Sequence, residues 1–159
     1  MSFFLHTTLG QILMTFFVSM VPIIELRGAL PLATSSGLSP WIAIPVAVVG
    51  NLVPVPFIIL FIRKIFSWMR RLLPRLNSLV DRLEEKGKSK RDLINKGAFW
   101  GLFVLVAIPL PGTGAWTGAL VAAMLDLRLK SAFPAIALGV VAAGIVVAFA
   151  SYGAASLFA

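Results

Sequence analysis

The stretch Pro45-Val46-Ala47-Val48-Val49-Gly50 recurs 89 residues later as Pro134-Ala135-Ile136-Ala137-Leu138-Gly139. The same offset, without a gap, carries further residues of the first half onto identical residues of the second: Pro22 onto Pro111, Ala33 onto Ala122 and Leu38 onto Leu127. In membrane proteins, proline-broken apolar segments at corresponding positions of two repeats indicate a substrate path at the repeat interface. The offset therefore predicts an internal repeat with a site between its halves.

Hydrophobic residues dominate the composition. They make up 59% of the 159 residues, against 13% charged residues. Charged side chains are nearly absent from four long stretches, 3–37, 40–62, 97–125 and 131–159. Each stretch exceeds the roughly 20 residues that a helix needs to span a bilayer core. We expect an all-α integral membrane protein, multi-pass in the cell (inner or cytoplasmic) membrane, with residues 1–159 forming a single membrane domain.

The residue types argue against several kinds of chemistry. The sequence has no cysteine, and its one histidine, His6, lies near a terminus. Thiolate chemistry needs cysteine, and a catalytic metal site or a Ser-His-Asp arrangement needs more than this one histidine. We therefore expect no enzyme, no catalytic residue, no metal site and no cofactor.

The positive charge is concentrated in one block. Residues 63–96 contain eleven Lys or Arg against four Asp or Glu. Because membrane segments flank the block, the positive-inside rule explains it better than nucleic acid binding does, and places it in the cytoplasm. Its apolar residues recur at helical spacing, which predicts a basic amphipathic helix on the inner leaflet or, alternatively, a seam in a homodimer. The chain then divides into repeat 1 (about 3–66), this linker (about 67–96) and repeat 2 (about 97–159).

The charges also distinguish two topologies. If the first and third stretches were plain spanning helices, Arg128 and Lys130 would lie outside, against the positive-inside rule. If each is a re-entrant hairpin that turns at its prolines, the turn 126–130 becomes cytoplasmic and both termini lie outside. The spanning helices 40–62 and 131–158 then cross in opposite directions. We prefer this inverted repeat, in which each half is a re-entrant helical hairpin followed by a spanning helix, over four plain spans.

The expected hairpin tips carry residues that are unusual in a membrane. In the first tip, Glu25 and Arg27 stand within an apolar run. An unpaired charge at that depth costs at least about 2.5–3.5 kcal/mol, so both must face each other, a partner segment or water. In the second tip, Pro109, Pro111, Gly112 and Gly114 predict broken backbone, with Thr113 capping a helix that resumes at Ala115. Broken backbone survives in a membrane only against protein or a wet cavity, so we expect the tips to meet.

The expected meeting point favours an anion. Both returning half-helices, beginning near Gly28 and Ala115, would aim free amides and positive dipole ends at the midplane, and Arg27 adds a charge. Glu25 would orient Arg27 or carry a proton. Alternatively, Glu25 and Arg27 form a neutral structural pair. The candidate substrate-binding residues are Glu25, Arg27, Gly28, Pro111, Gly112, Thr113, Gly114, Trp116 and Asn51.

Asn51 has two interpretations. It lies close to Pro54 and Pro56, which cannot donate backbone hydrogen bonds. Its amide could bond a carbonyl that these prolines free, or it could extend the polar path. Of the two, we prefer the bond to a carbonyl.

Two segments resemble a known family. Glu-Leu-Arg-Gly-Ala-Leu-Pro at 25–31 and Pro-Leu-Pro-Gly-Thr-Gly-Ala-Trp-Thr-Gly at 109–118 resemble the paired motifs of the small multidrug export family, a distant relative of the DedA and VTT membrane proteins. The resemblance covers nearly the whole chain, and the second motif is the more specific. It implies inverted re-entrant hairpins and transport of lipid carriers such as undecaprenyl phosphate, or lipid scrambling, with proton coupling as an option. The chain departs from the DedA pattern at Trp116, which the offset places opposite Arg27 where DedA proteins have an arginine.

We therefore expect a small membrane transporter of DedA-like architecture that moves an amphipathic, anionic substrate, such as a polyprenyl-phosphate lipid carrier, with proton coupling as an option. Its expected partners are membrane lipids, this substrate and protons, without nucleic acid, and a homodimer is compatible with the sequence. The alternatives are an exporter of small cationic drugs and a non-transporting assembly factor or scaffold. A membrane enzyme is disfavoured because no nucleophile and base set is present.

Overall fold

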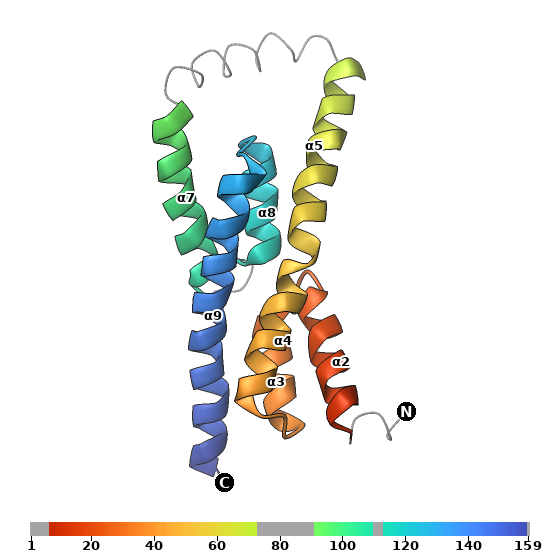
Figure 1. Ribbon diagram of the computed structural model, residues 1–159, viewed down its shortest axis with the longest axis vertical. Helices are drawn as coiled ribbons and strands as arrows, with labels where there is room; N and C mark the ends of the chain where they lie inside the picture. Colours follow the sequence, from red (N-terminus) through yellow and green to blue (C-terminus); the bar gives the residue numbers. More distant parts are fainter. Residues whose placement is uncertain (1–6, 73–90, 110–112, 159) are drawn as a thin grey trace.

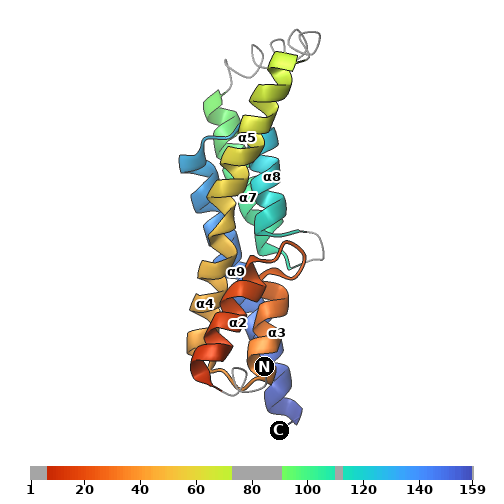
Figure 2. The ribbon, with the colours of Figure 1, turned by 90° about the vertical axis from the view of Figure 1, so that its right-hand side faces the viewer.

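Two helical hairpins and two long helical columns make up the fold. The computed structural model describes residues 7–72, 91–109 and 113–158. The elements of these residues are all helices: α2 (Thr8–Met20), α3 (Glu25–Ser35), α4 (Pro40–Leu52), α5 (Pro54–Leu72), α7 (Arg91–Ala107), α8 (Ala115–Met124) and α9 (Leu129–Phe158). α2 and α3 form one hairpin, α7 and α8 the other, and the hairpins come from opposite ends of the molecule (Figures 1 and 2).

The two segments predicted to span the membrane, 40–62 and 131–158, are long apolar helical columns in the structure. Pro40–Ile62 covers 23 residues with a mean hydropathy of 2.3, and Leu129–Ser156 covers 28 residues with a mean hydropathy of 2.4. Both are long and apolar enough to cross a membrane. α4 passes into α5 at Val53, because Pro54 and Pro56 cannot donate to the helical ladder.

Two turns that the 89-residue offset pairs share one backbone pattern. After α3, Leu38 N–H donates to Ala33 O at 3.0 Å, and after α8, Leu127 N–H donates to Ala122 O at 2.9 Å. Gly37 and Asp126 precede these leucines with φ of 81° and 50°, the left-handed conformation that commonly ends a helix. The turns therefore reverse the chain in the same way in both halves.

Small residues allow the helices of each half to pack closely. A Cβ added at Gly50 would overlap the Ser19 side chain and the Phe16 carbonyl of α2, and one at Gly139 would press on Val106 of α7. Gly50 and Gly139 are also paired by the offset. Close backbone approach at small residues is a usual way to pack helices in membranes, where burial of apolar surface gives little drive.

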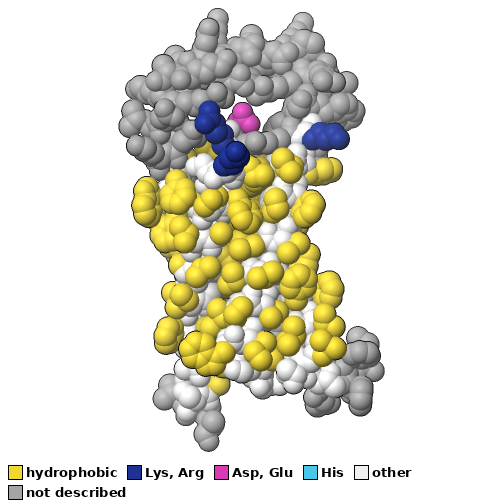
Figure 3. Space-filling model, viewed as in Figure 1, with side chains coloured by type: hydrophobic (Ala, Val, Ile, Leu, Met, Phe, Trp, Pro, Cys, Tyr) yellow, Lys and Arg dark blue, Asp and Glu magenta, His cyan; other side chains and the backbone are white. Residues whose placement is uncertain are grey.

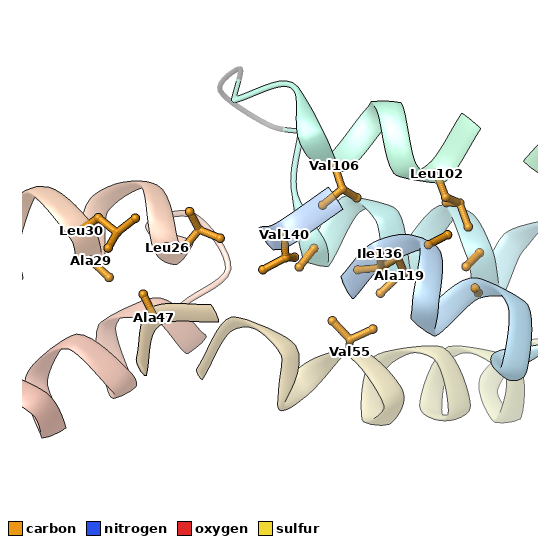
Figure 4. Close-up of a cluster of buried hydrophobic side chains, with 14 of the residues drawn as sticks. Leu26, Ala29, Leu30, Ala47, Val55, Leu102, Val106, Ala119, Ile136 and Val140 are labelled. Carbon is orange, nitrogen blue, oxygen red and sulfur yellow. The ribbon is translucent and has the colours of Figure 1, made fainter. Parts of the chain in front are cut away.

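The core runs the length of the molecule along one face of α4–α5. Residues at four-residue spacing on this face are fully buried: Ala43, Ala47, Asn51, Val55 and Ile59. Figure 4 shows Ala47 beside Ala29 and Leu30 of α3, whereas Val55 faces Ile136 of α9. In this column, α4 thus packs on α3 of the first hairpin, whereas α5 packs on α9.

The outer surface separates apolar and charged side chains. Exposed hydrophobic side chains form a broad belt, and exposed Lys64, Asp126, Arg128 and Lys130 gather at one end, where α5 ends and α7 begins (Figure 3). The start of α2 and the end of α9 lie at the opposite end (Figure 1). An apolar belt with charge collected at one end is the distribution expected of a membrane protein.

The predicted amphipathic linker lies largely outside the described residues. α5 continues to Leu72 and α7 begins at Arg91, so helices extend into both ends of the predicted 67–96 segment. Residues 73–90 between them are not described, and the amphipathic helix stays a prediction.

Candidate functional site

The two hairpin tips meet halfway along the molecule. The connection from α2 to α3 and the one from α7 to α8 lie at the same level in Figure 1. Side chains of the first tip bond the backbone of the second hairpin, and a side chain of the second hairpin bonds the backbone of the first. The expected contact between the tips is therefore present.

Glu25 caps the start of α8. Its side chain is buried, with the residue 5% exposed. Oε1 accepts a hydrogen bond from Trp116 N–H at 3.2 Å, and the carboxylate also accepts from Ala115 N–H. A negative charge at a helix N-terminus is stabilised by the free amides and the helix dipole. The first hairpin thus supplies a carboxylate to the first turn of a helix in the second.

Thr113 does not cap α8. The helix begins at Ala115 as predicted, but its N-cap residue is Gly114, without a side-chain capping bond. The Thr113 hydroxyl donates instead to Ile108 O at 2.9 Å and accepts from Arg27 at 3.4 Å. The capping prediction was wrong because the local rule could not foresee a carboxylate arriving from 91 residues away.

Arg27 binds the end of α7. Its Nη2 donates to Ile108 O at 3.1 Å and more weakly to Val106 O at 3.5 Å. α7 ends at Ala107, so these carbonyls belong to a helix C-terminus, where a cation is favourable. Together, Glu25 and Arg27 place an acid at the start of one helix and a base at the end of its neighbour.

Trp116 makes the reciprocal contact. Its indole Nε1–H donates to Met20 O at 3.2 Å, and Met20 is the last residue of α2. The offset places Trp116 opposite Arg27. Arg27, on α3, donates to a carbonyl at the end of α7, and Trp116, on α8, donates to the carbonyl at the end of α2. The second helix of each hairpin thus binds the end of the first helix of the other hairpin.

Backbone geometry at the tips supports the contact. Glu25 has a φ of 50°, in the left-handed region that a residue other than glycine rarely adopts. Such a conformation persists only where surrounding contacts hold it, and it is frequent at functional sites. Gly114 has extended backbone with φ of 172°, and its importance is steric, because an added Cβ would overlap the Glu25 carboxylate.

The remaining predicted tip residues differ in how they relate to this contact. Gly28 lies in the first turn of α3, which begins at Glu25 rather than near Gly28, and its N–H donates to Ile24 O at 2.9 Å. A Cβ at Gly28 would overlap the Ile24 side chain. Pro111 and Gly112 lie outside the described residues.

Asn51 is a buried amide without a hydrogen bond. The residue is 1% exposed, and among the residues that the structure describes neither its Nδ2 nor its Oδ1 has a hydrogen-bond partner. The preferred interpretation, a bond to a carbonyl freed by Pro54 or Pro56, is therefore wrong. Asn51 lies four residues from both Ala47 and Val55, so it falls where the core passes from one half of the molecule to the other (Figure 4). An unsatisfied buried amide costs about 1–3 kcal/mol and calls for an explanation.

An open groove beside Trp116 was not predicted as such. It has a volume of about 550 Å³ between α5 and the start of α8, and is lined by Pro54, Phe57, Ile58, Leu60, Phe61, Lys64 and Trp116. The sequence signal is the spacing of Phe57, Leu60, Phe61 and Lys64, which puts all four on one face of α5. In the described residues, no three His, Cys, Asp or Glu side chains form a group that could hold a metal ion.

Comparison with known proteins identifies a family. The family model described as "Putative small multi-drug export protein" matches residues 25–146, which include Glu25 and the rest of α3, α4–α5, the α7–α8 hairpin and most of α9. No curated protein and no solved structure matches the chain.

Proposed function

Because the chain belongs to the small multi-drug export protein family, we propose that it is a membrane transporter that moves an amphipathic, anionic substrate, such as a polyprenyl-phosphate lipid carrier, across the membrane. The observation that carries the proposal is the reciprocal contact of the tips. Glu25 and Arg27 bond the α7–α8 hairpin, and Trp116 bonds the end of α2. Charged groups at membrane depth and helices that end there are typical of substrate sites in transporters.

The proposed topology is an inverted repeat with two re-entrant hairpins. Its support is the approach of α2–α3 and α7–α8 from opposite ends, and the opposite course of α4–α5 and α9 (Figure 1). α2, α3 and α8 contain 13, 11 and 10 residues, too few to cross a bilayer core of about 30 Å. The positive-inside rule then puts the end with Lys64, Arg128 and Lys130 in the cytoplasm.

In the proposed mechanism, Glu25 is an internal competitor of the substrate. Its carboxylate occupies the α8 N-terminus, which is the group that would otherwise bind a phosphate. A phosphate would bind there, and to Arg27, when the tips separate. Substrate binding and tip contact are then alternatives, which links occupancy of the site to a change in its shape.

Proton coupling follows from the same competition. A protonated Glu25 has no charge and bonds the α8 N-terminus more weakly than the carboxylate does. Protonation would release these amides and Arg27 for the substrate anion. Asn51 would offer a second polar contact next to the tips, because its amide has both donor and acceptor capacity left.

The same experiments test two alternative functions. The family description suggests export of drugs, and for a lipophilic cation Glu25 would be the counter-charge. In a non-transporting scaffold, Glu25 and Arg27 would only hold the two halves together. We also propose that membrane lipids are partners of the chain, that it forms a homodimer, and that its central segment lies in the cytoplasm.

Flux into proteoliposomes tests the proposal. The purified chain is reconstituted and supplied, in separate assays, with a short-chain polyprenyl phosphate and with a lipophilic cation. We expect protein-dependent movement of the phosphate that stops in Glu25→Gln. Movement of the cation alone would favour drug export, and movement of neither would favour the scaffold.

A further inference from the structure

The groove between α5 and α8 is apolar for most of its length and cationic at one end. Phe57, Leu60 and Phe61 line it and are 69%, 53% and 64% exposed. Lys64 lines its end at the charged side of the molecule, and Trp116 lines it at the level of the tips. Trp116 is the one groove-lining residue that also takes part in the described contacts between the tips.

The length of the groove matches one leaflet. Pro54 and Lys64 are ten residues apart on α5, which corresponds to about 15 Å at about 1.5 Å per residue. Half of a bilayer core of about 30 Å has the same thickness. A hydrocarbon chain whose headgroup lies beside Lys64 would therefore end near Trp116.

Charge complementarity identifies the headgroup. Lys64 is exposed at the apolar border, and lysine at such a border extends its ammonium group toward the headgroup layer. A headgroup with a net negative charge gains an attraction there that a zwitterionic headgroup, whose phosphate is balanced by its own cation, largely lacks. The described acid at this end is Asp126, which lies on the α8–α9 turn and does not line the groove.

We propose that the groove binds one chain of an anionic phospholipid from the leaflet at the charged end, with its phosphate at Lys64 and its chain end against Trp116. The occupant is a resident bilayer lipid, and the proposal requires the membrane location but no transport. In this proposal the face of the Trp116 ring contacts lipid, while its indole Nε1–H donates to Met20 O.

Fluorescence quenching by brominated lipids tests the assignment. In a chain with Trp41, Trp68 and Trp100 replaced by Phe, Trp116 is the one remaining tryptophan, and excitation beyond the absorption of Tyr152 selects its fluorescence. We expect phosphatidylglycerol brominated near the chain end to quench it more than the same lipid brominated near the carbonyl. We also expect phosphatidylglycerol to quench about fivefold more effectively at low mole fraction than phosphatidylcholine, the preference that one lysine confers. Lys64→Gln should abolish that preference.

A second single-tryptophan chain is the matched control. Trp100 on α7 is 64% exposed and does not line the groove, so a chain retaining only Trp100 reports the average lipid around this cationic protein. Equal lipid selectivity at Trp100 and Trp116, or selectivity at Trp116 that survives Lys64→Gln, would overturn the proposal. Native mass spectrometry of the chain with all its tryptophans gives an independent measurement: it should retain more phosphatidylglycerol from a mixed bilayer than its Lys64→Gln variant, and equal retention would also overturn the proposal.

Discussion

Glu25 and Gly114, which the 89-residue offset places on one another, are in direct contact. The Glu25 carboxylate fills the space that a side chain at Gly114 would need. In the proposed inverted repeat, a residue that touches its own counterpart lies at the axis relating the two halves. The two halves therefore differ at this axis. The first half supplies the Glu25 carboxylate, and the second supplies the backbone N–H groups that donate to it.

Gly114→Ala should disrupt the tip contact. The added Cβ forces the Glu25 carboxylate away from Trp116 N–H, with an overpacking cost of about 1–3 kcal/mol. We expect a lower thermal denaturation temperature in detergent and at least a tenfold loss of flux. Gly101→Ala is the control, because nothing lies within 4 Å of a Cβ added there, and its stability should equal or exceed that of the wild type since alanine favours a helix interior. A wild-type denaturation temperature for Gly114→Ala would contradict the contact.

Glu25→Gln and Arg27→Ala should each abolish transport while leaving folded protein in the membrane. Gln keeps the shape of the side chain but loses the charge at the α8 N-terminus, and Ala removes the donor to Ile108 O. Flux is measured alongside size-exclusion chromatography. Arg128→Ala, which removes an exposed cation, should leave flux unchanged. Wild-type flux in both tip variants would show that the pair is only structural.

Asn51→Leu should raise the stability of the protein and lower its transport activity. Leu has the same branching and number of side-chain heavy atoms as Asn and removes a buried amide that has no hydrogen bond among the described residues, so we expect stability to rise by about 1–3 kcal/mol. Flux should fall, because the polar contact beside the tips is lost. The measurements are thermal denaturation and proteoliposome flux. A destabilised Asn51→Leu would mean that the amide supports the fold.

Cysteine labelling should distinguish re-entrant hairpins from four plain spans. Arg128 and Ser156 lie at opposite ends of α9 and are both exposed. With re-entrant hairpins, an impermeant thiol reagent labels a cysteine at Ser156 from outside and one at Arg128 only after the cell is opened. The four-span arrangement gives the reverse result. Ser35, at the outer end of α3 in both arrangements, is the positive control for outside labelling.

Binding of a phosphorylated polyprenyl lipid should tighten as pH falls. Protonation of Glu25 removes the negative charge that competes for the α8 N-terminus and frees Arg27 for the phosphate. Titration of a fluorescent polyprenyl phosphate across a pH series measures the effect, and Glu25→Gln should bind with no such pH dependence. Tighter binding of a lipophilic cation, lost in Glu25→Gln but kept in Arg27→Ala, would instead support drug export.

Much of the fold could be predicted from local sequence. Apolar length predicted long helices at 40–62 and 131–158, which the structure has at Pro40–Ile62 and Leu129–Ser156, and the Pro-Gly pattern predicted that α8 resumes at Ala115. Both signals depend on residues close together in the chain: hydropathy summed over a helix, and backbone groups that proline and glycine remove or free. The expectation that the tips meet came from one further argument, the cost of charges in hydrocarbon.

The partners within the site could not be predicted in this way. Thr113 was the best local cap for α8, but Glu25 takes that position, because a carboxylate bonds a helix N-terminus more strongly than a hydroxyl does. Asn51 was assigned to a nearby carbonyl and is instead enclosed by the packing of both halves. In each case the deciding neighbour is far away in sequence, so it is known only once the helices are placed.

The hydrogen bonds between the two hairpin tips have a consequence during synthesis. Glu25 leaves the ribosome about 90 residues before Trp116, which at about 5–20 residues per second is an interval of roughly 5–18 s. During that interval neither Glu25 nor Arg27 can reach its binding partners, and each would cost about 2.5–3.5 kcal/mol in hydrocarbon. In the proposed topology, these two side chains must therefore face each other, water or another protein until the C-terminal half has been made.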